Sequence, residues 1–433
     1  MAEDTPEPKL DSYAVLKEPY IGAFTVGRAL SNMSMQVVSV AVGWDLYERT
    51  ANPLSLGLVG AAQVAPAVLL MLLSGSVSDR FSRRNIAMIA ASITGACALG
   101  LAYVSWTHAP VEVIYVLLFI SGAARTFSVP AVNSMLAHIL RPELLSYGYA
   151  WLVSSSQLAN MTGPAAGGFL IGVTGGAAPA YLVAAASQLI FVALLATLPR
   201  ADPPPGLTRP GLSDIFGGIG FIKSTPVFLA AITLDLFAVL FGGAIALLPV
   251  FAKDVLDAGA SGLGLLRSSP AVGAVLTTLI LTRLPPWQRP GLVMLVSVAT
   301  WGAAIVAFGM SRELWLSMLF LFISGCADSI SVVIRGTIQQ VMTPNRLRGR
   351  VSAVNSLFVS LSNELGGFRA GVMASSIGAV PAVVFGGAFT LAVVPVVALL
   401  CRQLVRVGPL HTLQPEENKT EPESVRAVAS KSS

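Results

Sequence analysis

Residues 53–84 read PLSLGLVGAAQVAPAVLLMLLSGSVSDRFSRR, an apolar run without any charge that ends in one aspartate and three arginines. A helix that crosses about 30 Å of hydrocarbon needs roughly 20 predominantly apolar residues. Because lipid offers the backbone no hydrogen-bond partners, such a run has to satisfy its own polar groups as a helix. The stretch therefore predicts a membrane-spanning helix that stops at a charged membrane surface.

The composition of the whole chain matches this one stretch. Of 433 residues only 11% are charged and 54% are apolar, whereas roughly 25% are charged in soluble proteins. So few charges cannot cover a soluble surface, which leaves an integral membrane protein. The three cysteines and three histidines share no metal-ligand or catalytic spacing, and no nucleotide-binding glycine-rich loop is found. We therefore expect no enzyme, no cofactor and no metal site.

Twelve apolar runs, separated by polar breaks, predict twelve transmembrane helices. They lie near 20–47, 53–78, 85–106, 112–138, 145–172, 178–198, 226–252, 260–284, 291–310, 314–341, 351–376 and 378–404. The longest internal break, 199–225, contains Pro203-Pro204-Pro205 and divides them into six and six. We therefore expect a polar tail over 1–19, six-helix halves over 20–198 and 226–405, a linker over 199–225 and a second polar tail over 406–433.

Positive charges predict the orientation in the cell membrane. The breaks after the even runs hold twelve Lys and Arg residues, and those after the odd runs hold only Arg49, Lys253 and Arg312. Because cytoplasmic loops carry the excess of bases, the even breaks and both tails are expected on the cytoplasmic side. The bases thus follow membrane topology, and we expect lipid, not nucleic acid, around the chain.

The two halves contain similar segments in the same order. Phe119-Ile-Ser-Gly122 returns as Phe322-Ile-Ser-Gly325, and Leu56-Gly57-Leu58 returns as Leu263-Gly264-Leu265. Internal duplication of this kind is typical of transporters that bind their solute between two repeats. The expected fold is an all-α membrane protein with two pseudo-symmetric six-helix bundles.

The charged break after the second run carries a recognisable motif, Gly75-Ser-Val-Ser-Asp79-Arg80-Phe-Ser-Arg83-Arg84. It resembles the loop motif of the major facilitator superfamily, Gly-x-x-x-Asp-Arg/Lys-x-Gly-Arg-Arg/Lys, with Ser82 in place of the second glycine. The resemblance implies a gating role, in which Asp79 interacts with the positive N-terminal end of the eleventh helix and holds the cytoplasmic side closed.

The fifth run contains a second motif, Gly163-Pro164-Ala-Ala-Gly167-Gly168. A kinked helix with a small-residue packing face explains it, and in the superfamily a similar ending of this helix is associated with antiporters. Stretches such as Gly122-Ala-Ala-Arg-Thr-Phe-Ser-Val-Pro-Ala131 look similar to the bacterial multidrug and siderophore exporter branch, which includes enterobactin exporters. That resemblance implies proton-driven efflux of a small molecule by a monomer.

Ionisable residues inside the predicted helices are the candidates for function. An ionised group costs several kcal/mol in lipid unless it is paired or faces water; the alternative role is a structural ion pair between helices. Since arginine stays charged, a coupled proton needs an acid, and Asp328, with Asp235 and then Glu364 as alternatives, is our candidate. Further candidates line the central cavity that the superfamily builds from helices 1, 4, 7 and 10. They are Arg28, Asn32, Gln36, Arg125, Arg335 and Gln339.

The first hypothesis is thus a proton-coupled exporter of small amphipathic compounds, drug-like or siderophore-like, that works by alternating access. Uptake of an anionic nutrient on Arg28 and Arg125 is the second hypothesis. Movement of lipid between leaflets, and a receptor or scaffold that transports nothing, are the others. Measured flux and its direction distinguish among them.

Overall fold

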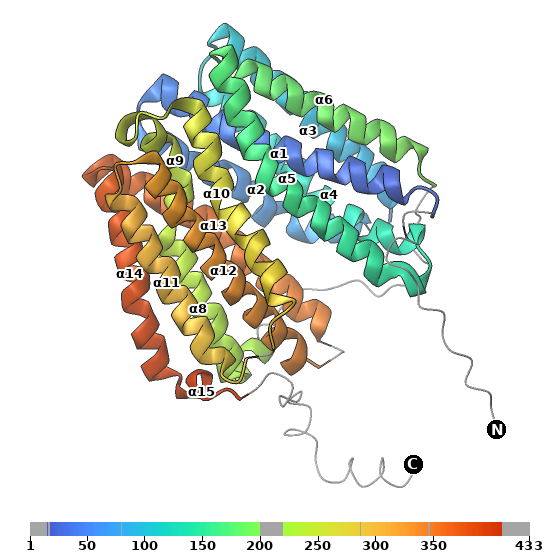
Figure 1. The fold of residues 1–433 in the computed structure, drawn as a ribbon. Coiled ribbons are helices and arrows are strands. Elements are labelled where there is room, and N and C mark those ends of the chain that lie inside the picture. The colour runs from blue at the N-terminus through green and yellow to red at the C-terminus, as the bar shows by residue number, and fades with distance from the viewer. Residues whose placement is uncertain are drawn as a thin grey trace, which may run out of the picture. The chain divides into compact units, whose positions relative to one another are not determined.

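The computed structural model describes residues 15, 18–78, 80–199, 220–285, 287–344 and 347–408, and all regular structure in these ranges is helical (Figure 1). Six long helices precede the linker: α1 (Ile21–Thr50), α2 (Pro53–Ser78), α3 (Arg83–Thr107), α4 (Glu112–Ile139), α5 (Leu145–Thr174) and α6 (Ala178–Thr197). Six long helical segments follow it: α8 (Pro226–Gly242) with its continuation, α10 (Gly259–Leu281), α11 (Pro290–Met310), α12 (Leu314–Met342), α13 (Arg348–Ile377) and α14 (Ala379–Leu400). The expected all-α membrane fold is confirmed.

Within the described residues, nine of these segments are long and apolar enough to cross a membrane by composition alone. The other three helices, α1, α5 and α13, are less apolar, because each carries charged or amide side chains along its length. Polar groups in a membrane helix face the protein interior or a water-filled cavity. The three exceptions are therefore the helices on which a polar site is expected.

Several helices end where the backbone leaves the helical conformation at a single residue. Ala51, His108 and Gly175 follow α1, α3 and α5 with positive φ angles of 48°, 50° and 72°, and each amide donates back to a carbonyl of the last turn. This left-handed cap satisfies carbonyls that the helix itself leaves without partners. It also turns the chain within few residues, which keeps the connections short.

The chain forms two compact units. Unit 1 consists of Met1–Ala51, Ala61–Arg209 and Asp257–Ser268, and unit 2 consists of Asn52–Gly60, Pro210–Leu256 and Ser269–Ser433. The boundaries fall inside α2, after Gly60, and inside α10, after Ser268. Each of these two helices therefore contributes residues to both units.

The seventh predicted helix is interrupted, which the apolar pattern does not predict. After α8 the chain continues as the 3₁₀ turn η3 (Ala244–Leu247), the short α9 (Leu248–Val250) and the π-helical turn η4 (Phe251–Val255). The interruption begins at Gly243, where the backbone angles (φ −20°, ψ 25°) are not helical. A non-helical segment at membrane depth needs side chains that satisfy its backbone groups, and Arg369 of α13 supplies them, as described below.

The repeat found in the sequence recurs as equivalent packing within the units. In unit 1 the α-carbon of Gly122 on α4 packs against Gln63 and Pro66 of α2, and in unit 2 Gly325 on α12 packs against Pro270 of α10. An added Cβ would collide with these neighbours at either glycine. Small residues allow such close backbone approach in membrane proteins. The two repeats therefore have a similar glycine-mediated helix contact as well as a similar sequence pattern.

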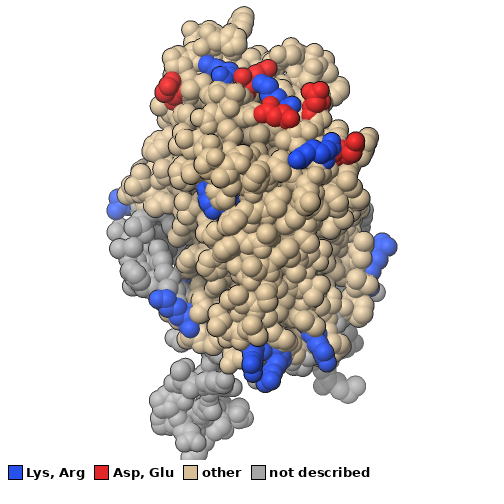
Figure 2. All heavy atoms as spheres, turned by 90° about the vertical axis from the view of Figure 1, so that its left-hand side faces the viewer, with Lys and Arg blue, Asp and Glu red and all other residues tan. Residues whose placement is uncertain are grey.

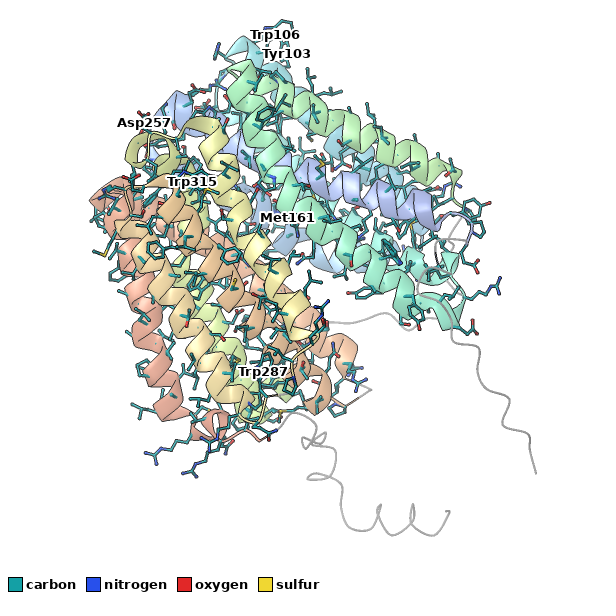
Figure 3. The ribbon with its side chains drawn as sticks, in the orientation of Figure 1. Tyr103, Trp106, Met161, Asp257, Trp287 and Trp315 are labelled. Carbon is teal, nitrogen blue, oxygen red and sulfur yellow. The ribbon has the colours of Figure 1, made fainter. Side chains whose placement is uncertain are left out.

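The surface has the pattern of a protein that lies in a bilayer. On the face in Figure 2, the acidic residues gather near the top, and the broad middle is mostly uncharged, with a few basic residues and no acidic one. Within unit 1, Tyr103 and Trp106 are exposed near the end of α3, and within unit 2, Trp315 is exposed at the start of α12 (Figure 3). Exposed aromatic rings near helix ends are typical of the membrane–water interface.

Candidate functional site

Unit 1 contains a polar cavity of about 370 Å³, formed by α1, α4 and α5. Its lining residues are Arg28, Asn32, Met35, Gln36, Arg125, Ser156 and Asn160. Four of the residues expected at a cavity from the sequence therefore lie together, namely Arg28, Asn32, Gln36 and Arg125. The volume lies within the roughly 300–1,000 Å³ of ordinary small-molecule sites.

Hydrogen bonds between side chains order this cavity. Arg28 Nη2 donates to the side-chain oxygen of Asn133 on α4 over 2.9 Å. Asn32 Nδ2 donates to Ser156 Oγ over 2.8 Å, and Gln36 Nε2 donates to Asn160 Oδ1 over 2.7 Å. Because each bond joins two helices, the polar groups also hold α1 against α4 and α5.

The motif of the fifth helix determines how closely α5 approaches α1. A Cβ on Gly163 would lie 2.7 Å from the Cβ of Gln36, and one on Gly167 would lie 3.3 Å from the α-carbon of Val37. Gly168 faces Gly264 of α10, within unit 1, where two glycines let the backbones meet. Pro164 lies inside the continuous helix α5. The motif thus packs three helices and brings Gln36 to the cavity.

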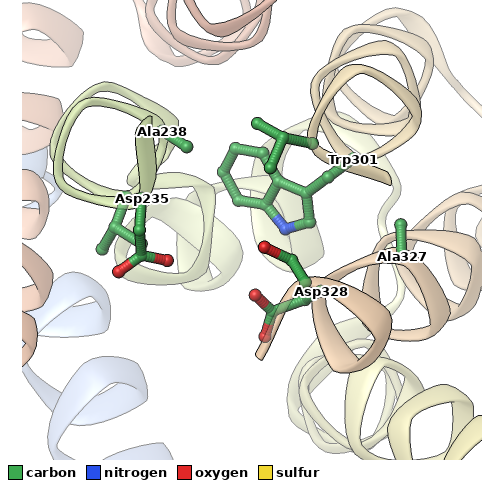
Figure 4. Close-up of a pocket in the computed structure, with 8 residues that line it drawn as sticks. Asp235, Ala238, Trp301, Ala327 and Asp328 are labelled. Carbon is green, nitrogen blue, oxygen red and sulfur yellow. The ribbon is translucent and has the colours of Figure 1, made fainter. Parts of the chain in front are cut away.

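Unit 2 contains a second, much smaller cavity of about 10 Å³, room for about one water molecule. Asp235 of α8, Trp301 of α11, and Asp328 and Ser331 of α12 supply its polar lining atoms. In Figure 4 Asp235, Asp328 and the ring of Trp301 surround one space, with the ring next to Asp328. The structure thus brings the first two acid candidates to one place, together with a tryptophan and a serine that sequence analysis did not single out.

Asp235 forms a buried ion pair with Arg335 of α12. Their side chains are 12% and 8% exposed, so little water reaches the pair and each charge depends on the other. Asp328, two helical turns before Arg335 on α12, has an exposed side chain. The two acids therefore differ: Asp235 is buried and paired, whereas Asp328 is exposed at the protein surface and borders the same cavity.

Two other candidates from the sequence lie apart from the lining of both cavities. Glu364 on α13 is partly buried and packs against α2 within unit 2, where a Cβ on Gly60 would lie 2.8 Å from its Oε2. Gln339 is partly buried in the last part of α12. The amino-acid pattern marked both as polar groups in apolar helices, but such a pattern does not tell which groups share a cavity.

The loop motif is described only in part. Asp79 lies outside the described residues, and Gly75 lies within α2. Arg80 is exposed, Arg83 lies 3.4 Å from His138, and Arg84 Nη1 donates to the carbonyl of Leu198 at the end of α6 over 2.5 Å. A cation at a helix C-terminus is favourable, so Arg84 stabilises the end of α6.

Two partly buried arginines, Arg267 and Arg369, form hydrogen bonds to neighbouring helices. Arg267 of α10 donates to Ser39 Oγ over 2.6 Å and to its carbonyl over 3.2 Å. Arg369 of α13 donates to the carbonyls of Leu240 and Phe241, the last residues of α8 before the interruption, the first over 2.9 Å. Its guanidinium also lies 5.2 Å from the centre of the Phe241 ring. Both arginines therefore hold helices together through hydrogen bonds.

Comparison with known proteins identifies the family. The family model of the Major Facilitator Superfamily matches residues 24–367. The chain belongs to this superfamily. It is therefore a multi-pass membrane protein and a secondary transporter of small molecules, not an enzyme. The superfamily resemblance that the loop motif and the repeat indicated is thus confirmed.

The relatives compared with this superfamily member are distant. The enterobactin exporters EntS of Shigella flexneri and of Citrobacter koseri are each 26% identical to it over 337 residues, which cover 78% of this chain and 80% of theirs. Among solved structures, a bacterial homologue of the human lysosomal transporter Spinster superposes with a TM-score of 0.71 at 16% identity, covering 89% of this chain and 98% of that one. The nucleoside transporter NupG gives 0.67 at 16% identity, over 90% and 100%. At these identities the structures support the fold alone.

Proposed function

We propose that the protein is a proton-coupled exporter of small amphipathic organic compounds, drug-like or siderophore-like, which works by alternating access. One observation carries this proposal: unit 2 holds two carboxylates at one cavity, Asp235 paired with Arg335 and Asp328 exposed at the protein surface. An exposed carboxylate in a membrane helix can take up and release a proton, whereas an arginine cannot. The distant similarity to enterobactin exporters favours outward transport.

In this proposal the two units have different tasks. The polar cavity of unit 1 binds the solute, with Arg28, Asn32, Gln36 and Arg125 as its contacts. The acids of unit 2 exchange the proton, with Asp328 first, Asp235 second and Glu364 as the next candidate. Asp79 of the loop motif acts on the equilibrium between conformations. The protein works as a monomer in the cell membrane.

Both tails lie in the cytoplasm in this proposal, because the bases between helices are concentrated in the even breaks. A reporter fused after Ser433 should then be active on the cytoplasmic side. Activity on the opposite side would contradict the orientation and leave the proposed transport chemistry untouched.

Membrane vesicles of known orientation test the direction of transport. In inverted vesicles, whose interior corresponds to the outside of the cell, a proton gradient that is acidic inside should drive accumulation of a fluorescent amphipathic compound. An uncoupler should abolish this accumulation, and vesicles without the protein should show none. Accumulation in right-side-out vesicles alone, driven by the opposite gradient, would show uptake.

Uptake of an anionic nutrient is the second candidate, because both charged residues at the unit 1 cavity are arginines. The same vesicle experiment, done with a carboxylate solute, separates it from export by direction.

A further inference from the structure

The lining of the unit 1 cavity contains basic residues and no acidic one. Of its seven lining residues, Arg28 and Arg125 carry guanidinium groups, four have neutral polar side chains, one is Met35, and none is acidic. Guanidinium groups remain protonated at any physiological pH. Both side chains therefore stay cationic in every step of a transport cycle, and the lining itself contains no acidic residue.

The guanidinium group of Arg28 binds a neutral side chain among the described residues. Its hydrogen bond goes to Asn133, whose amide oxygen is neutral. Its Nε atom is buried and makes no hydrogen bond to any described residue. A cation held partly out of water by neutral groups alone remains costly, since a neutral acceptor offsets only part of the lost hydration. Arg335 in unit 2 differs, because a carboxylate faces it directly.

The chemistry of the guanidinium group indicates which solute would offset this cost. Its planar set of N–H donors matches the two oxygens of a carboxylate, sulfonate or phosphate, and such charge-assisted pairs are about twice as strong as neutral hydrogen bonds. The amides of Asn32, Gln36 and Asn160 and the hydroxyl of Ser156 lie around the same space and can bond to polar substituents. A cationic solute would instead be repelled by Arg28, whose hydrogen-bond partner Asn133 is neutral.

We propose that the unit 1 cavity selects organic anions and that Arg28 binds their acidic group. This inference rests on the proposed function and narrows it: the solutes are amphipathic acids that carry a negative charge near neutral pH, while neutral and cationic compounds of similar size bind weakly. Because the positive charges of the lining do not titrate, the preference for an anion is independent of the proton carried by unit 2.

A pair of nearly isosteric probes tests the proposal without transport. Binding of 2-naphthoate, an anion, and of 2-naphthamide, its neutral analogue, is measured by calorimetry on the purified full-length protein in detergent. We expect the anion to bind about tenfold or more tightly than the amide, the size expected of one charge-assisted hydrogen-bonded pair. Arg28→Gln should remove most of this difference, and Arg28→Lys should retain part of it.

The control variant is Arg283→Gln, which removes the same charge from an exposed position outside the cavity and should keep the full preference. Equal binding of the two probes to the wild type, no binding of either, or an unchanged preference in Arg28→Gln would each overturn the proposal. An anion preference without proton-driven flux in vesicles would instead contradict the proposed exporter and leave the anion site standing. Proton-driven flux of neutral solutes without an anion preference would contradict the anion site and leave the proposed exporter standing.

Discussion

Asp235 and Arg335 neutralise each other's charge inside unit 2. The pair is nearly closed to solvent, and removing one partner of a buried ion pair leaves the other charge without compensation, at a cost of about 3–5 kcal/mol. We therefore expect Asp235→Asn and Arg335→Gln each to lower the unfolding temperature of the purified protein in detergent. The double variant should lose less than the two single changes together, because it leaves no buried charge behind. Strictly additive losses would show that the pair does not stabilise unit 2.

Sequence reasoning identified both partners but not their pairing. A charged letter inside an apolar run is visible in a single sequence, so Asp235, Asp328 and Arg335 were all candidates. Which acid meets which base depends on how α8 packs against α12, and this is a property of the tertiary structure. Trp301 illustrates the same limit, since a tryptophan in an apolar helix has no signal that separates a cavity wall from a lipid-facing ring.

At the scale of the helical elements, glycines determine which residues reach the solute cavity. Gly163→Ala would place a methyl group 2.7 Å from the Cβ of Gln36, which forces α1 and α5 apart or displaces Gln36. We expect this variant to reduce solute binding several-fold while the protein still folds. Gly176→Ala, just beyond the end of α5 with no atom within 4 Å of the new methyl group, is the matched control. Unchanged binding in Gly163→Ala would mean that the position of Gln36 does not matter.

The interruption after α8 depends on one arginine of a distant helix. Arg369 donates to two carbonyls that α8 leaves without helical partners, and a buried acceptor that loses its donor costs about 1–3 kcal/mol. Arg369→Gln should therefore lower the unfolding temperature in detergent, and Arg369→Leu should lower it further. Arg402→Gln, at an exposed position, should change it little. If Arg369→Leu unfolds at the wild-type temperature, the arginine does not support the end of α8.

The helices themselves were predictable for a simple physical reason. Roughly 20 apolar residues in lipid satisfy their own backbone only as a helix, so no knowledge of neighbours is needed, and the predicted ranges agree with the observed helices to within a few residues. The interruption at Gly243 was not predictable, because glycines occur throughout these helices. Only the partner that α13 supplies to α8 distinguishes this position from an ordinary packing glycine.

At the scale of the whole molecule, the proposed transporter has a solute cavity in one unit and a proton-exchanging acid in the other. In this proposal, movement of a proton on Asp328 drives the solute against its gradient. Replacing Asp328 with asparagine, its uncharged isostere, should then uncouple proton flux from solute flux. It should leave the solute site in place, because the lining of the unit 1 cavity is unchanged. Solute binding and solute exchange should persist, and only accumulation should be lost.

The most direct test compares wild type and Asp328→Asn in reconstituted vesicles, with Asp257→Asn, an exposed residue outside both cavities, as the control. For each protein, solute accumulation driven by a proton gradient and solute exchange without a gradient are measured on the same preparation. Asp328→Asn should lose accumulation and keep exchange, while Asp257→Asn should keep both. Accumulation against the gradient by Asp328→Asn would contradict the claim that this acid couples proton entry to solute exit.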